Sequence, residues 1–117
     1  MKDKNDKLID PNEAVDYMIA KSGEYAQAKA NRIYVEEYRK TLKAELCKRA
    51  MEAGYEAVNA QEREAYSHPD YKAHLTAIKQ AVEAEEKLRW MLIAAEARIS
   101  VWRSLEASNR MQDKATI

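Results

Sequence analysis

The sequence has no phenylalanine, one cysteine, two glycines and two prolines among its 117 residues. Such a small number of turn-forming residues excludes the many short strands of a sheet protein. The lone Cys47 cannot form an internal disulfide, which is in keeping with a reducing compartment. The residues that dominate instead are Ala, Glu, Lys, Leu and Arg, all good helix formers. The composition therefore predicts one all-α domain.

Net charge is absent as well, because 20 basic residues balance 20 acidic ones. The chain as a whole thus has no attraction to nucleic acid or to anionic lipid, and charge has to be examined locally. No uncharged stretch reaches the roughly 20 residues of a membrane helix, and the first ten residues lack the apolar core of a signal peptide. We expect a cytoplasmic protein with no membrane partner.

Residues that carry chemistry are few and poorly spaced. His68 and His74 are six residues apart and off one helical face, and Cys47 is not at a spacing that suggests a catalytic dyad or a metal site. The glutamates between residues 83 and 86 resemble a di-metal carboxylate motif only in part, because the Glu-x-x-His partner is missing. The sequence therefore predicts no catalytic residue, no metal, no cofactor and no enzymatic activity.

The clearest boundary in the chain is Ser67-His68-Pro69-Asp70. A residue before proline disfavours helical geometry, whereas proline fits a first helical turn, and Ser67 with Asp70 has the form of a capping box. Gly23 and Gly54 either break or bend the helices in which they lie. The expected organisation is a disordered tail at 1–10, a single helical domain at 11–112 with helices at about 11–22, 24–66 and 69–110, and a frayed tail at 113–117.

Two helices of this length predict an extended antiparallel helical hairpin, coiled-coil-like, with a short N-terminal helix packed across it. Apolar residues recur along the second long helix at three- and four-residue steps, with one short step near Glu85. This predicted seam consists of Tyr71, Leu75, Ile78, Val82, Leu88, Leu92, Ala95, Ile99 and Trp102.

The same helix has a second apolar face between Leu88 and Leu105. A monomeric amphipathic helix needs only one such face, so the second predicts a second packing partner. Either the short N-terminal helix covers it within one chain, or a homo-oligomer does. We expect the oligomer, because the short helix spans only part of the length. Its predicted interface consists of Leu88, Trp90, Leu92, Ile93, Ile99, Val101, Trp102 and Leu105.

Local charge is concentrated in residues 28–49, which we call the basic segment. It carries seven basic residues against three acidic ones, and tyrosines are interleaved with the cations. Cations along a phosphate backbone beside rings on which bases stack are what sequence-tolerant binding of single strands requires. A solvated charged face with rim tyrosines is the plainer interpretation. The candidate nucleic-acid-binding residues are Lys29, Arg32, Tyr34, Tyr38, Arg39, Lys40 and Lys43.

The order of these segments resembles the UvsY-type recombination mediators of tailed phages, over roughly residues 29–105. The similar parts are the basic stretch ending in residues 42–46 (LKAEL), the turn from Tyr66 to Tyr71 and the apolar helix from Leu88 to Ile99. The resemblance implies a helical protein that assembles into rings and loads a recombinase onto single-stranded DNA. In that family a basic pair in the first helix is implicated in DNA contact; Lys43 stands at the first position, and Glu45 replaces the second.

The sequence thus favours an oligomeric accessory protein that binds single-stranded DNA and assists a recombinase or an annealing protein. Two other functions fit the same residues. One is a phage inhibitor that binds a host defence or nuclease protein, for which a mixed and neutral surface is suitable. The other is a structural coiled-coil scaffold that assembles without either ligand.

Overall fold

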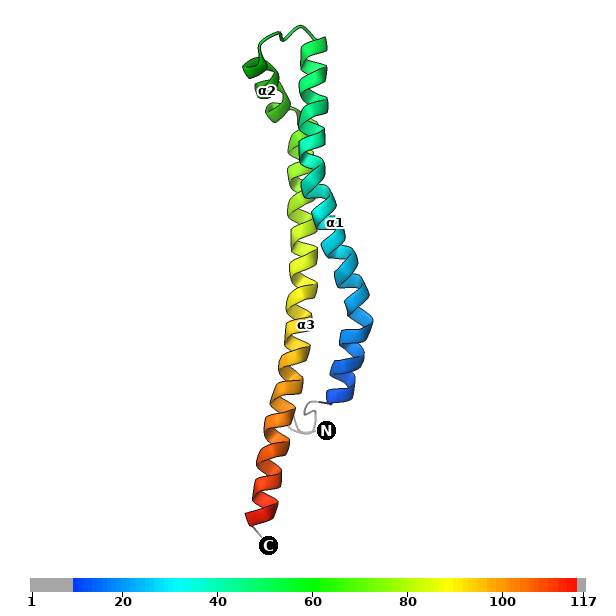
Figure 1. Cartoon of the computed structure of the whole chain (residues 1–117), viewed down its shortest axis with the longest axis vertical. Coiled ribbons are helices and arrows are strands. Elements are labelled where there is room, and N and C mark those ends of the chain that lie inside the picture. Colours follow the sequence, from blue (N-terminus) through cyan, green and yellow to red (C-terminus); the bar gives the residue numbers. More distant parts are fainter. Residues whose placement is uncertain (1–9, 116–117) are drawn as a thin grey trace, which may run out of the picture. The chain divides into compact units, whose positions relative to one another are not determined.

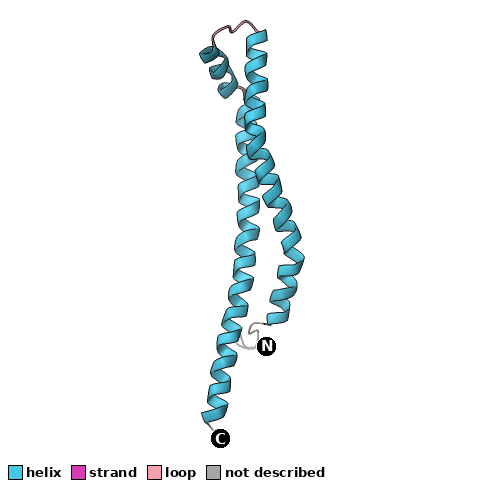
Figure 2. Cartoon of the chain, in the orientation of Figure 1, coloured by secondary structure: helices cyan, strands magenta, loops and turns pink. Residues whose placement is uncertain are grey.

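The computed structural model describes residues 10–115, and all secondary structure in this range is helical (Figures 1 and 2). The elements are α1 (Pro11–Glu52), α2 (Val58–Ser67) and α3 (Pro69–Ala115). The all-α prediction is confirmed. The helices divide into two compact units, one joining residues 11–25 to 87–115 and the other spanning 26–86, and α1 and α3 contribute to both.

The separate N-terminal helix expected at 11–22 is wrong, because α1 continues through Gly23. One glycine inside a helix costs only about 1 kcal/mol relative to alanine, which its helix-forming neighbours offset. The helix begins at a cap, where the Oδ1 atom of Asp10 accepts a hydrogen bond from the Asn12 amide at 2.9 Å. Asp10 therefore belongs to the start of α1; the rest of the tail expected at 1–10 lies outside the described residues.

Gly54 ends α1, so the helix expected at 24–66 is two helices. Its φ of 107° is a left-handed conformation that side chains disfavour. The Gly54 amide donates to the Met51 carbonyl at 3.1 Å, and the Tyr55 amide donates to the Ala50 carbonyl at 3.0 Å. These two bonds are the Schellman arrangement, which satisfies the last carbonyls of a helix. The chain then turns and starts α2.

Between α2 and α3 the cap is His68 rather than the predicted Ser67. Ser67 completes α2, and its hydroxyl donates back to the Arg63 carbonyl at 2.7 Å, so it is not available to the next helix. The Nδ1 atom of His68 instead accepts from the Asp70 amide at 3.0 Å. Pro69 occupies the first helical position, as expected. The third helix continues to Ala115 and includes most of the predicted frayed tail.

In the unit spanning residues 26–86, α1 and α3 run antiparallel and α2 packs against them (Figure 1). Leu42 and Leu46 of α1 form its buried cluster with Ala65 of α2, which is 0% exposed. The ring of Tyr71 on α3 packs against this cluster. Residues from all three helices thus share one small core, and the short α2 is held through Ala65.

The buried side of α3 follows a strict alternation of three- and four-residue steps, which is the heptad spacing of a coiled coil. The predicted seam is correct at most positions, but it needs no short step near Glu85. His74 and Ala81 occupy the seam in place of the predicted Leu75 and Val82, and Glu85 fills the position that the prediction skipped. Leu75 is exposed, and Val82 is half-buried. We call this set the inner stripe: Tyr71, His74, Ile78, Ala81, Glu85, Leu88, Leu92, Ala95, Ile99, Trp102 and Glu106.

In the other unit, residues 11–25 of α1 pack with α3 from Lys87 onward. The buried residues here are small, Ala14 on α1 and Ala95 on α3, which permits close approach of the two helices. Tyr17 and Met18 add half-buried side chains. Every residue of α3 from 107 to 115 is exposed, so α1 covers only the earlier part of this segment.

Candidate nucleic-acid and oligomer interfaces

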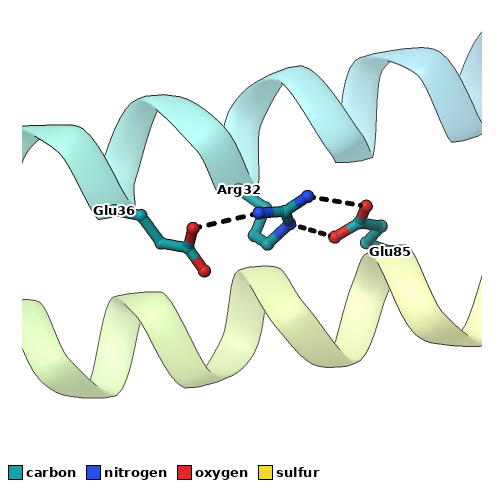
Figure 3. Close-up of polar contacts among 3 residues, drawn as sticks. All are labelled: Arg32, Glu36 and Glu85. Carbon is teal, nitrogen blue, oxygen red and sulfur yellow. Dashed lines mark hydrogen bonds and ion pairs between the residues drawn. The ribbon is translucent and has the colours of Figure 1, made fainter.

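Arg32 of the basic segment is held between two carboxylates (Figure 3). Its guanidinium donates through Nε and Nη2 to Glu85 on α3, the second of these bonds measuring 3.2 Å, and through Nη1 to Glu36 at 3.0 Å. The hydrogen bonds to Glu85, and after them those to Glu36, raise the pKa of Arg32 far above its ordinary value. This cation neutralises a buried carboxylate, and its donors face protein acceptors rather than a phosphate.

Lys43 also has partners within the protein. Its ammonium lies 3.6 Å from the Glu62 carboxylate and 4.8 Å from the centroid of the Tyr66 ring, both on α2. The nearby Tyr66 hydroxyl, and after it Glu62, raise the pKa of Lys43 above its ordinary value of 10.5. Lys43 therefore joins α1 to α2, which reduces its capacity to bind an external anion.

Three of the predicted cations remain on the surface: Lys29, Arg39 and Lys40 are all exposed. Lys40 lies 3.5 Å from Glu37, but both side chains are largely in solvent, and such pairs contribute little. Neither Lys29 nor Arg39 has an ion-pair partner among residues 10–115. The structure thus narrows the cations available for phosphate from five to these three.

Tyr34 and Tyr38 form the aromatic part of the candidate site. Their ring centroids are 6.2 Å apart with an interplanar angle of 19°, so the rings are stacked along α1. Tyr38 is half-buried and also contacts the His74 ring of α3, whereas Tyr34 is 67% exposed. The Tyr34 ring is thus largely exposed to solvent while it stacks on the ring of Tyr38.

The predicted oligomer interface on α3 divides into two groups. Four of its residues lie on the inner stripe and are half-buried within their own unit: Leu88, Leu92, Ile99 and Trp102. The other four are exposed: Trp90, Ile93, Val101 and Leu105. The N-terminal part of α1 therefore covers the first group and leaves the second uncovered.

Three of these exposed residues, Trp90, Ile93 and Val101, belong to a face of α3 that carries no charge over three heptads, and Leu105 lies at the edge of this face. Arg89 lies at its edge, 5.2 Å from the centroid of the Trp90 ring. Trp90 itself is 59% exposed. We call this face the outer stripe: Trp90, Ile93, Ala94, Ala97, Ser100, Val101, Ser104, Ala107, Ser108 and Met111.

Sequence reasoning missed the polar residues of the inner stripe. His74 was not part of the predicted seam, but it is half-buried and its Nε2 atom lies 2.5 Å from the Val35 carbonyl oxygen. Glu85 was expected to be a skipped step, but it is buried and binds Arg32. The regular seven-residue spacing from Ile78 through Glu85 to Leu92 was the available signal.

Other kinds of site find no support in the described part of the chain. Residues 10–115 contain no group of three or more His, Cys, Asp or Glu side chains placed to hold a metal. A shallow hollow on α2 is lined by Asn59, Glu62, Arg63 and Tyr66 and is open to solvent. No helix among these residues is long and apolar enough to cross a membrane. Comparisons with protein-family models, curated proteins and solved structures found no match.

Proposed function

We propose that this chain is an oligomeric accessory protein without catalysis of its own, which binds single-stranded DNA and assists a recombinase or an annealing protein. The observation that supports DNA contact most directly is the exposed Tyr34 ring, stacked on Tyr38 within a helix that also exposes three of the five predicted cations. Stacking of a base on an aromatic ring contributes about 1–3 kcal/mol and tolerates any sequence. The cations add a salt-dependent attraction to the backbone.

Assembly is supported by a separate feature, the outer stripe of α3. Monomeric proteins rarely expose contiguous apolar faces of this kind. A modest set of cations on each protomer becomes an effective track for a strand when several copies present it together. Assembly would thus strengthen DNA binding that is weak in one chain.

The test is fluorescence anisotropy with a 30-nucleotide oligo(dT) at 50 mM salt. We expect the charge reversal Arg39→Glu/Lys40→Glu to weaken binding at least about tenfold, because phosphate attraction becomes repulsion. Tyr34→Ala should weaken binding by about 1–3 kcal/mol through lost stacking. The matched control is Lys72→Glu/Lys79→Glu, which changes the charge equally at exposed positions outside the basic segment.

An equal loss of DNA affinity in the control variant Lys72→Glu/Lys79→Glu would show that net charge alone drives binding. No binding at low salt by the unaltered protein would remove DNA from the proposal. The mixed and neutral charged surface is also suitable for binding a host protein, which is the inhibitor function. Stoichiometric capture of one purified host defence or nuclease protein, without DNA binding, would establish that function in its place.

A further inference from the structure

The outer stripe of α3 is flanked by two opposite charges that have no ion-pair partner within residues 10–115. Glu96 and Arg103 are both exposed, seven residues apart, and lie along the same edge of the stripe. Among the described residues neither takes part in an ion pair. An uncharged face bordered by unpaired complementary charges is typical of a helix that packs against another helix.

We propose that a second copy of this chain packs antiparallel along the outer stripe, about a two-fold axis between residues 99 and 100. This rests on the assembly part of the proposed function and specifies its partner and orientation. An axis at this point places Glu96 of each copy opposite Arg103 of the other. One residue pair thus forms two intermolecular ion pairs.

Side-chain size supports the same axis. It brings Val101 of one copy to within one residue of the level of Ala97 of the other, and Trp90 to within one residue of Ser108, so that each large side chain lies beside a small one. Ser100 lies at the axis, where its small size allows the helices to approach closely. From Trp90 to Met111 the contact extends over about 32 Å at 1.5 Å per residue.

A parallel pair lacks this complementarity. In it Arg98 of each copy lies two residues from Glu96 and five from Arg103 of the other, so Arg98 attracts Glu96 while Arg103 gains no partner. The antiparallel pair has one unfavourable element of its own, because Arg89 and Arg110 of the two copies meet at its ends. Those ends are solvent-exposed, where screening weakens repulsion. This predicts that Arg110→Glu tightens an antiparallel dimer, since it would then attract Arg89.

The first measurement is molar mass by light scattering across a dilution series, in a Cys47→Ser background. We expect a dimer that Trp90→Glu converts to monomer and that Arg110→Glu strengthens severalfold. Ile19→Glu is the matched control, because Ile19 is 69% exposed in the same unit but lies on α1. It should leave both the dimer and the helical circular dichroism unchanged.

The second measurement is disulfide cross-linking between singly substituted chains. Ala94→Cys protein mixed with Ser104→Cys protein should form a heterodimeric disulfide, because the axis brings these positions to within one residue of the same level. Neither protein alone should cross-link. Cross-linking of Ala94→Cys to itself would indicate a parallel pair and overturn the inference while leaving assembly intact. A stable 13.5 kDa monomer would overturn the assembly part of the proposed function as well, whatever the DNA assay shows.

Discussion

Glu85 is a carboxylate at a heptad position where its neighbours on the inner stripe are Ala81 and Leu88, and it is only 6% exposed. A buried charge of this kind is costly unless it is paired and hydrogen-bonded. The forked guanidinium of Arg32 supplies two donors to it (Figure 3). At this position of the contact between α1 and α3, the hydrogen bonds of each charged side chain are satisfied only when the other is present.

Replacing one member of the Arg32–Glu85 pair should lower the stability of the protein more than replacing both members. We expect Arg32→Met and Glu85→Met each to lower the midpoint of thermal unfolding, because each leaves one ion without its partner. The double variant Arg32→Met/Glu85→Met should recover most of the loss, since two apolar chains can pack together. Circular dichroism melts measure the cycle, with Arg39→Met as an exposed control. Additive losses in the double variant would contradict this account.

Lys43 gives a prediction for alkaline pH. Its folded pKa is raised, first by Tyr66 and then by Glu62, so the folded state favours the charged form. The resulting stabilisation is complete below the ordinary value of 10.5 and is lost as pH rises through the folded pKa. NMR titration of the Lys43 side chain should show a lower pKa in Tyr66→Phe and in Glu62→Gln than in the unaltered protein. An unchanged pKa in both variants would argue against the contact.

At the scale of the element, the two glycines of the chain have opposite roles. Gly23 lies inside α1, and a Cβ atom there would have no atom within 4 Å to meet. Gly54 has a φ of 107° and forms the C-terminal cap of the same helix. The same substitution should thus have opposite effects at the two sites.

We expect Gly23→Ala to stabilise the protein by about 0.5–1 kcal/mol, because alanine restricts the unfolded chain and suits the helix. Gly54→Ala should destabilise it by about 1–2 kcal/mol, the cost of a left-handed conformation with a Cβ atom. Urea unfolding monitored by circular dichroism measures both. Effects of the same sign would show that the local backbone does not control these positions.

Helix type was predictable from composition and spacing, but helix ends were not. The sequence shows Gly23 and Gly54 alike, and only backbone conformation distinguishes the glycine that continues a helix from the one that ends it. Ser67 is a better capping residue than His68 by preference, yet its hydroxyl is used within α2. In each case hydrogen bonds to neighbouring turns, rather than the propensity of the residue itself, determine where the helix ends.

The candidate DNA site was predictable only in part, for a reason that concerns long-range pairing. Lys43 and Arg32 are indistinguishable in sequence from Lys29 and Arg39. Their partners come from α2 and α3, and an opposing charge far along the chain is not visible from the basic segment itself. The division of the apolar helix into an inner and an outer stripe likewise depends on where α1 packs.

For the molecule as a whole, net charge is zero, so the salt dependence of any DNA binding depends on the local cations that contact phosphate. With the three exposed cations of the candidate site, Lys29, Arg39 and Lys40, the slope of log affinity against log salt should be about −2 for one protomer on a single strand. A strand held by the segments of two protomers should give about −4. Anisotropy titrations between 25 and about 200 mM salt measure this. A slope near zero would mean that phosphate contacts contribute little.

The helix α2 has only ten residues. Isolated helices shorter than about 12–15 residues are marginal in water, so α2 is a helix only while its single buried residue, Ala65, remains seated on the core. Undocking and unwinding of this segment are therefore one event. Amide hydrogens across its hydrogen-bonded turns should exchange with solvent at a common rate, which makes α2 the least protected cooperative segment of its unit.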